Sequence, residues 1–156
     1  MSLPPRVVYD CNVLLQAIIS QRGPAGAAVD AVYERRVVLF LSQLIIDELQ
    51  DVATRPHIAR KFSLTQEKIA SFIATLQQSS QHLSTVPHVF DLTRDPADAH
   101  YVDLAVAASA QLIVSRDADL LSLGDPATPE GRAFAVTFPA LRILTPPQLL
   151  AELADV

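Results

Sequence analysis

The chain has 156 residues, half of them hydrophobic, and 17 acidic against 12 basic side chains give a formal net charge of −5. This composition excludes a disordered chain, and no apolar run is long enough to span a bilayer. We therefore expect one compact domain over residues 1–156 with no membrane association. The acidic balance excludes a protein that coats nucleic acid by bulk attraction. A single cysteine and an N-terminal segment without signal-peptide features favour a cytoplasmic protein.

Short apolar runs alternate with helical patterns along the chain. In chain order we expect a strand at 7–9, a helix at 25–34, a strand at 37–41, helices at 44–53 and 65–80, strands at 82–86, 112–114 and 141–144, and helices at 96–108 and 146–153. Ser63 and Gln66 form the expected capping box of helix 65–80, and the Gly- and Pro-rich segment 122–132 predicts a loop. This alternation predicts an α/β fold, a three-layer α/β/α sandwich with a central parallel sheet.

Two aspartates follow predicted strands. Asp10 directly follows strand 7–9, and Asp117 follows strand 112–114 after a two-residue step. The carboxyl ends of parallel strands share one edge of the sheet, where ligands bind, so we expect both carboxylates at that edge. Taken singly, each also fits a helix N-cap, a role that Asp often fills.

Glu48 falls within the apolar stripe of helix 44–53, three residues after Ile45 and four before Val52. Asp47 and Asp51 fall on the other side of this helix and are expected to be solvated. A buried carboxylate without a partner costs several kcal/mol, so Glu48 needs one. The partner is either an arginine, in an ordinary buried ion pair, or a cation bound at a site.

Asp98 stands at the start of helix 96–108. Together with Asp95 and a proline at the first helical position, it makes an ordinary acidic helix start that needs no chemistry. Asp98 also shares the inward face of the helix with Tyr101, whereas Asp103 is expected on a different side. We therefore rank Asp98 above Asp103 and Asp95 as a site residue.

Four acids from separate segments, Asp10, Glu48, Asp98 and Asp117, are thus expected at one edge of the sheet. Carboxylates held close together repel unless a proton or a cation neutralises them. Mg²⁺ or Mn²⁺ fits an all-oxygen set, whereas no Cys/His spacing supports zinc. Removing these four of the 17 acids would leave 13 against 12 basic residues, so most of the acidic excess belongs to this set. Such a metal centre suits phosphodiester hydrolysis.

Four motifs in this order resemble the PIN-domain family, in particular the VapC-like toxin branch of prokaryotic toxin–antitoxin systems. They are the stretch 9–15 (YDCNVLL), Glu48 with Leu49, Arg94-Asp95-Pro96 through Asp98, and the stretch 112–121 (LIVSRDADLL). The resemblance covers nearly the whole chain. It implies an α/β/α sandwich and a divalent-metal-dependent endoribonuclease acting on single-stranded RNA, with an antitoxin protein as a partner and often a homodimer.

The resemblance also implies roles for individual residues. The matching positions assign catalytic and metal-binding roles to the four acids, and polar supporting roles to Asn12 and Ser115. Arg94 and Arg116 adjoin the acids and are candidate RNA-backbone contacts, with solvated surface charge as the ordinary alternative.

Two positions depart from the family pattern. Cys11 stands where the family often has a small hydroxyl residue, and we expect it to be a small buried hydrophobe. Ala99 follows Asp98 where a further acid is common, which weakens the case for a second metal ion. Asp119 is an available stand-in for that acid.

Other functions stay open at this point. A phosphatase of the haloacid dehalogenase type needs a second acid two residues after Asp10, where this chain has Asn12. A phospho-acceptor receiver domain, a signalling module, needs a lysine at the end of a late strand, and the only lysines are Lys61 and Lys68. A degenerate PIN module that binds nucleic acid without cutting it is a further alternative, which Ala99 favours.

Overall fold

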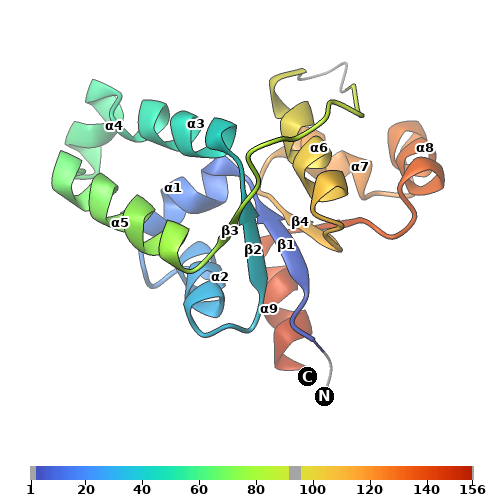
Figure 1. Cartoon of the computed structure of the whole chain (residues 1–156), viewed down its shortest axis with the longest axis horizontal. Helices are drawn as coiled ribbons and strands as arrows, with labels where there is room; N and C mark the ends of the chain where they lie inside the picture. Colours follow the sequence, from blue (N-terminus) through green and yellow to red (C-terminus); the bar gives the residue numbers. More distant parts are fainter. Residues whose placement is uncertain (1–2, 92–95, 156) are drawn as a thin grey trace.

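The computed structural model describes residues 3–91 and 96–155, and in this part of the chain a five-stranded sheet lies between helices (Figure 1). The strands are β1 (Arg6–Tyr9), β2 (Val38–Leu41), β3 (Gln81–His82), β4 (Leu112–Val114) and β5 (Arg142–Leu144). They lie in the order β3-β2-β1-β4-β5, and every neighbouring pair is parallel. The predicted α/β sandwich with a central parallel sheet is confirmed.

The helices are α1 (Cys11–Ile19), α2 (Pro24–Tyr33), α3 (Gln43–Ala53), α4 (Pro56–Lys61), α5 (Gln66–Gln78), α6 (Ala99–Ala107), α7 (Ala118–Leu123), α8 (Pro129–Thr137) and α9 (Pro146–Ala154), and a 3-10 turn, η1 (Pro96–Asp98), precedes α6. Helix α6 packs against β1, β2 and β4 on one face of the sheet, and α2 packs against α1 and α9 on the other (Figure 1). Within the described ranges, no helix combines the length and the apolar character needed to cross a membrane.

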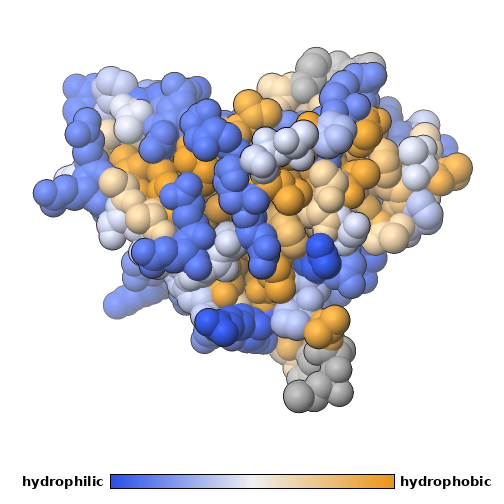
Figure 2. All heavy atoms as spheres, in the orientation of Figure 1, coloured by the Kyte–Doolittle hydropathy of each residue, from blue (hydrophilic) through white to orange (hydrophobic). Residues whose placement is uncertain are grey.

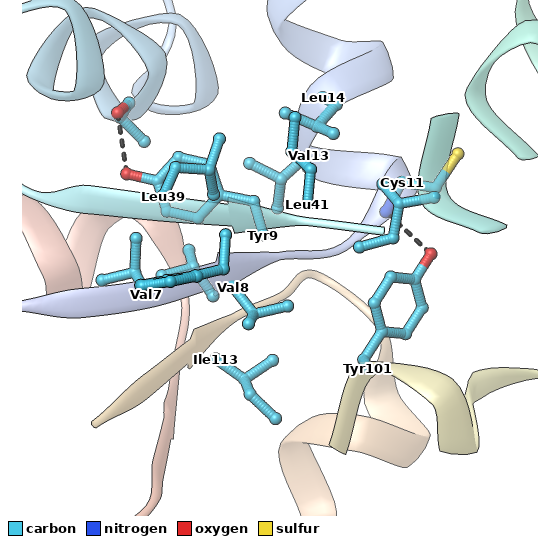
Figure 3. Close-up of a cluster of buried hydrophobic side chains, with 14 of the residues drawn as sticks. Val7, Val8, Tyr9, Cys11, Val13, Leu14, Leu39, Leu41, Tyr101 and Ile113 are labelled. Carbon is cyan, nitrogen blue, oxygen red and sulfur yellow. Dashed lines mark hydrogen bonds between the residues drawn. The ribbon is translucent and has the colours of Figure 1, made fainter. Parts of the chain in front are cut away.

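The core is centred on β1, the middle strand of the sheet. Val7, Val8 and Tyr9 are all fully buried, because helices cover both faces of the sheet. The hydroxyl of Tyr9 donates a hydrogen bond to the backbone carbonyl of Ala28 at 2.8 Å, which ties α2 to the sheet (Figure 3). The position of Asp10, which follows β1, is therefore set by the most buried strand of the fold.

The strand order places a topological switch point between β1 and β4. The chain passes from β1 to β2 on one side, while β4 lies on the other side of β1. The N–H of Asp10 donates to the carbonyl of Val114 at 3.0 Å, and the N–H of Ser115 donates to the carbonyl of Leu144 at 2.9 Å. Asp10, Ser115 and Thr145 are therefore neighbours along the carboxyl edge of the sheet, where open α/β sheets bind ligands.

Two predictions at the edge strand and its preceding helix are wrong. The N-cap of α5 is Thr65, whose hydroxyl accepts the N–H of Lys68 at 3.1 Å, whereas Ser63 lies outside the helix with φ of 54°. The strand expected over 82–86 is reduced to β3, because the chain leaves the sheet after the N–H of Leu83 bonds to the carbonyl of Leu41.

The predicted loop over 122–132 also needs correction. It begins inside α7 and ends inside α8, and α1, α4, α7 and α8 have no counterpart among the predicted helices. The hydroxyl of Thr128 accepts the N–H of Gly131 at 2.9 Å and caps α8. A Cβ on Gly131 would lie 1.8 Å from the carbonyl oxygen of Asp125. This glycine therefore permits a tight turn into a helix rather than marking a continuous loop.

Asp103, which the helical pattern placed on a different side of α6 from Asp98, is only 5% exposed. Its Oδ1 accepts the N–H groups of Val89 and Phe90 at 2.9 Å each, and its Oδ2 lies 2.8 Å from Nδ1 of His88. The segment 88–90 thus covers this side of the helix and is anchored by the carboxylate. A helical wheel cannot foresee such a contact, because the covering segment has no regular periodicity.

We expect Asp103→Ala to lower the free energy of unfolding by roughly 2 kcal/mol, because two backbone N–H groups lose their acceptor. Urea unfolding followed by circular dichroism measures this change, and Asp47→Ala on an exposed face of α3 is the matched control. Equal stabilities of these two variants would contradict the anchoring role of Asp103.

The same contact makes stability depend on pH. Hydrogen bonds to Asp103, then to Asp91, raise the pKa of His88. The stability that these hydrogen bonds add is therefore complete below the ordinary pKa of histidine, and it is lost as the pH rises through the raised pKa of His88.

Candidate functional site

Asp10 joins the end of β1 to the start of α1 and is 2% exposed. Its Oδ1 accepts the N–H of Val13 at 2.9 Å, and its Oδ2 accepts a hydrogen bond from the hydroxyl of Ser115. Burial raises the pKa of Asp10, and these hydrogen bonds oppose that shift. Asp10 is thus a helix N-cap, and the cap holds its carboxylate in one orientation at the switch point.

Ser115 connects Asp10 to Asp117. The serine is fully buried, and its oxygen donates to Asp10 while accepting the N–H of Asp117 at 2.9 Å. Asp117 is half-buried and caps α7 by accepting the N–H of Asp119 at 2.9 Å. The negative charge of Asp117 raises the pKa of Asp10 further, so the two carboxylates lie within electrostatic range of each other. The structure brings these residues together from the ends of β1 and β4.

Glu48 approaches the same region from α3, and its side chain is 31% exposed. It accepts a hydrogen bond from the hydroxyl of Tyr101, and its Oε1 lies 3.6 Å from Nε2 of His100. Burial acts to raise the pKa of Glu48, but the interactions with His100 and Tyr101 outweigh it and hold the pKa below its usual value. The sequence analysis expected an arginine or a bound cation as the partner of Glu48, and the structure shows a tyrosine and a histidine beside it. In the described part of the chain, no arginine forms an ion pair with it.

Tyr101 is a site residue that the sequence analysis did not identify. Its buried hydroxyl accepts the backbone N–H of Cys11 at 2.9 Å (Figure 3). The same hydroxyl donates a hydrogen bond to Glu48. Burial, followed by the charge of Glu48, raises the pKa of Tyr101, so the hydroxyl keeps its proton. One hydroxyl therefore links the first turn of α1, next to Asp10, to α3. The sequence did contain a sign of this role: Tyr101 lies on the inward face of its predicted helix, and a buried tyrosine hydroxyl usually forms a hydrogen bond.

Asp98 ends the turn η1 and stands at the N-cap position of α6, where its side chain makes no capping hydrogen bond. The helix-start interpretation of Asp98 also involves Asp95, which lies outside the described residues. Cys11 is buried, as predicted, and burial raises the pKa of its thiol to about 12, with further contributions from Glu48, Asp10 and Asp98. These three carboxylates thus lie around Cys11, within electrostatic range of its sulfur.

The other residues that the sequence analysis singled out differ in their exposure to solvent. Asn12 is exposed on the first turn of α1, and Arg116 is exposed between the buried Ser115 and Asp117. Arg94 lies outside the described residues, as does Asp95. Ala99 is buried at the start of α6, so no acidic side chain extends from this position.

The oxygen donors of this site suit a hard divalent cation. Within residues 3–91 and 96–155, no three His, Cys, Asp or Glu side chains converge closely enough to hold one ion. Mg²⁺ is commonly held by one or two carboxylates, with water and substrate phosphates completing its ligands, and the pair of Asp10 and Asp117 fits that arrangement. Zinc fits poorly, because zinc sites need three or four Cys, His or carboxylate ligands together, and no such group occurs within the described ranges.

Comparison with known proteins agrees with this architecture. The family model for the PIN domain matches residues 6–119, a range that starts in β1, ends in α7 and contains all four acids. The chain is also similar to an uncharacterized protein of Methanocaldococcus jannaschii, MJ1680, with 26% identity over 147 residues, which cover 94% of this chain and 90% of that protein. PIN domains are generally nucleases. Since the family match spans most of the chain and the fold agrees with it, the chain belongs to the PIN domain family.

Proposed function

We propose that this protein is a divalent-metal-dependent endoribonuclease that hydrolyses phosphodiester bonds of single-stranded RNA. The observation that carries the proposal is the pair of Asp10 and Asp117, joined by Ser115 at the switch point of the sheet. Glu48 and Asp98 lie within electrostatic range of Cys11, the residue that follows Asp10. Membership of a family of nucleases supports the same chemistry. An acidic site needs cations to accept a phosphate backbone, which agrees with a metal-dependent reaction.

Mg²⁺ or Mn²⁺ held by Asp10 and Asp117 would supply an activated water and stabilise the leaving oxygen. The protein's own contribution is the fixed orientation of its carboxylates. The start of α1 and the hydroxyl of Ser115 hold Asp10, while His100 and Tyr101 favour the ionised form of Glu48. Groups that are already oriented need no reorganisation during the reaction.

The proposal is tested by incubating short single-stranded RNAs with the protein in Mg²⁺, Mn²⁺ or EDTA. We expect cleavage with either metal ion and none in EDTA. Complete cleavage in excess EDTA would contradict the metal-dependent mechanism.

A second candidate is a PIN module that binds RNA without cutting it. Ala99 at the position of a common family acid favours it, as does the absence of three converging ligands among the described residues. In the same assay, this candidate predicts RNA that is bound but stays intact in both metal ions. The receiver-domain alternative loses its basis, because the chain belongs to the PIN family.

We further propose that the enzyme is the toxin of a toxin–antitoxin pair and forms a homodimer. The motifs that resemble the toxin branch support this proposal. Figure 2 shows hydrophobic residues in the middle of one face, between hydrophilic areas. Growth arrest on induced expression tests the toxin role, and light scattering in solution tests the dimer. An inactive toxin is expected for Asp10→Asn.

Tyr101→Phe tests whether the orientation of Glu48 matters to the reaction. The substitution removes one hydroxyl that serves both the N–H of Cys11 and Glu48. We expect kcat to fall about tenfold or more with little change in KM, and a loss of roughly 1–2 kcal/mol in the free energy of unfolding. Tyr33→Phe is the matched control, because this half-exposed tyrosine forms no hydrogen bond with the described residues through its hydroxyl. An unchanged kcat in Tyr101→Phe would contradict the role of Tyr101 in positioning Glu48.

A further inference from the structure

A groove of about 420 Å³ lies beside the candidate site, at the carboxyl edge of the sheet. Its walls come from the second half of α1, the starts of α2 and α9, and the connection between β4 and α7. This volume lies within the range of sites that bind small organic ligands.

Arg116 connects the groove to the site along the chain. This arginine lies on the groove wall and stands between Ser115 and Asp117 in the chain. Thr145, another wall residue, follows Leu144, whose carbonyl accepts the N–H of Ser115 at 2.9 Å. The groove therefore begins one strand away from Asp10 along the same edge of the sheet.

The charge of the groove is opposite to that of the protein as a whole. Among the described residues that line it, Arg116 is the one with a charged side chain. No described carboxylate forms an ion pair with Arg116, whereas Arg55 pairs with Asp51 at 3.0 Å. An unpaired cation in a groove of a protein with net charge −5 favours an anionic ligand.

The rest of the lining combines apolar and hydrogen-bonding surface. Leu121 and Pro146 contribute apolar walls, and Gln16 and Ser20 lie on the α1 side. Within the described ranges, neither the amide of Gln16 nor the hydroxyl of Ser20 has a hydrogen-bond partner. A nucleotide has the matching parts: a phosphate for the arginine, a flat apolar base, and polar edges for an amide and a hydroxyl.

We infer that this groove binds one nucleotide of the RNA strand, next to the phosphate that is cleaved. Arg116 contacts the phosphate of that nucleotide, and its base or ribose lies against Leu121 and Pro146 with Gln16 and Ser20 at its polar edge. This inference rests on the proposed function, since it assigns a binding subsite to the RNA substrate.

Gly23 allows the charge of the groove to be changed without harming the fold. It lines the groove, is the N-cap of α2 with φ of −82°, and a Cβ there would meet no atom within 4 Å. Asn and Asp are both favourable N-caps, so Gly23→Asn and Gly23→Asp should melt at or above the temperature of the parent. The two variants have nearly the same shape, and only Gly23→Asp adds a negative charge.

The experiment measures binding of a fluorescein-labelled single-stranded RNA by fluorescence anisotropy in Ca²⁺, with a gel to show that the RNA stays intact. We expect Gly23→Asp to bind about tenfold more weakly than Gly23→Asn, and Arg116→Ala to bind about tenfold more weakly than the parent. Arg116→Ala should also reduce the slope of log affinity against log salt by roughly one. Arg36→Ala is the matched charge control, because Arg36 precedes β2 at the opposite edge of the sheet and pairs with Glu34 at 3.9 Å.

The outcomes separate this inference from the proposed function. Equal binding by Gly23→Asp and Gly23→Asn, or by Arg116→Ala and Arg36→Ala, overturns the groove as a subsite even if the parent cleaves RNA. Selective weakening by Gly23→Asp and Arg116→Ala supports it even if the parent does not cleave. Failure of the parent to bind RNA overturns it as well.

Discussion

Asp10→Asn is expected to reduce cleavage of single-stranded RNA in Mn²⁺ by roughly a hundredfold or more, while the protein stays folded. An amide cannot supply the anionic oxygen that a divalent cation requires. The fold should persist because Asn caps helices about as well as Asp, so the bond to the N–H of Val13 is kept. Initial rates on a labelled RNA measure the activity, and circular dichroism verifies the fold.

Other acids provide the comparison. Glu48→Gln and Asp98→Asn should be nearly as damaging as Asp10→Asn. Asp47→Asn and Asp51→Asn should leave the rate close to that of the parent, because both side chains are exposed on α3, as the sequence predicted. If these two variants lose as much activity as Asp10→Asn, the assignment of the reacting carboxylates to one edge of the sheet is wrong.

Mn²⁺ is expected to stabilise the folded protein by roughly 2.7 kcal/mol when it is present at a hundred times its dissociation constant. Burial and the nearby Asp117 make ionised Asp10 unfavourable, and a bound cation removes that penalty. Asp10→Asn removes the same penalty without metal. The variant should therefore melt at a higher temperature than the parent in EDTA and gain less from Mn²⁺, as measured by thermal unfolding in both conditions.

The raised pKa of Asp10 also sets the direction of the pH dependence. The folded parent binds a proton at this carboxyl more readily than the unfolded chain does, so this part of its stability increases as the pH falls. The difference in melting temperature between Asp10→Asn and the parent in EDTA should therefore shrink as the pH is lowered from 7. A variant that melts below the parent in EDTA and responds to Mn²⁺ equally would show that Asp10 serves only as a cap.

The sequence by itself determined the class of fold and the place of the acids along it. Short apolar runs such as β1 are buried on both faces, and a strand of this kind is recognisable from its own residues. Asp10 and Asp117 lie at the carboxyl ends of β1 and β4 because parallel strands all end at the same edge. These predictions depend on periodicity within one segment and on the general geometry of parallel sheets.

Contacts between segments were decided only by the tertiary structure. The pattern of α3 showed that Glu48 needs a partner, but it could not identify Tyr101, which is 53 residues away. The pattern of α6 placed Asp103 on a different side from Asp98, but it could not show that the segment 88–90 covers that side, because this segment has no periodicity. The groove at Arg116 likewise exists only where α1, α2 and α9 meet. Local patterns record which face of an element is apolar, whereas the partner of a polar group depends on which elements pack against that face.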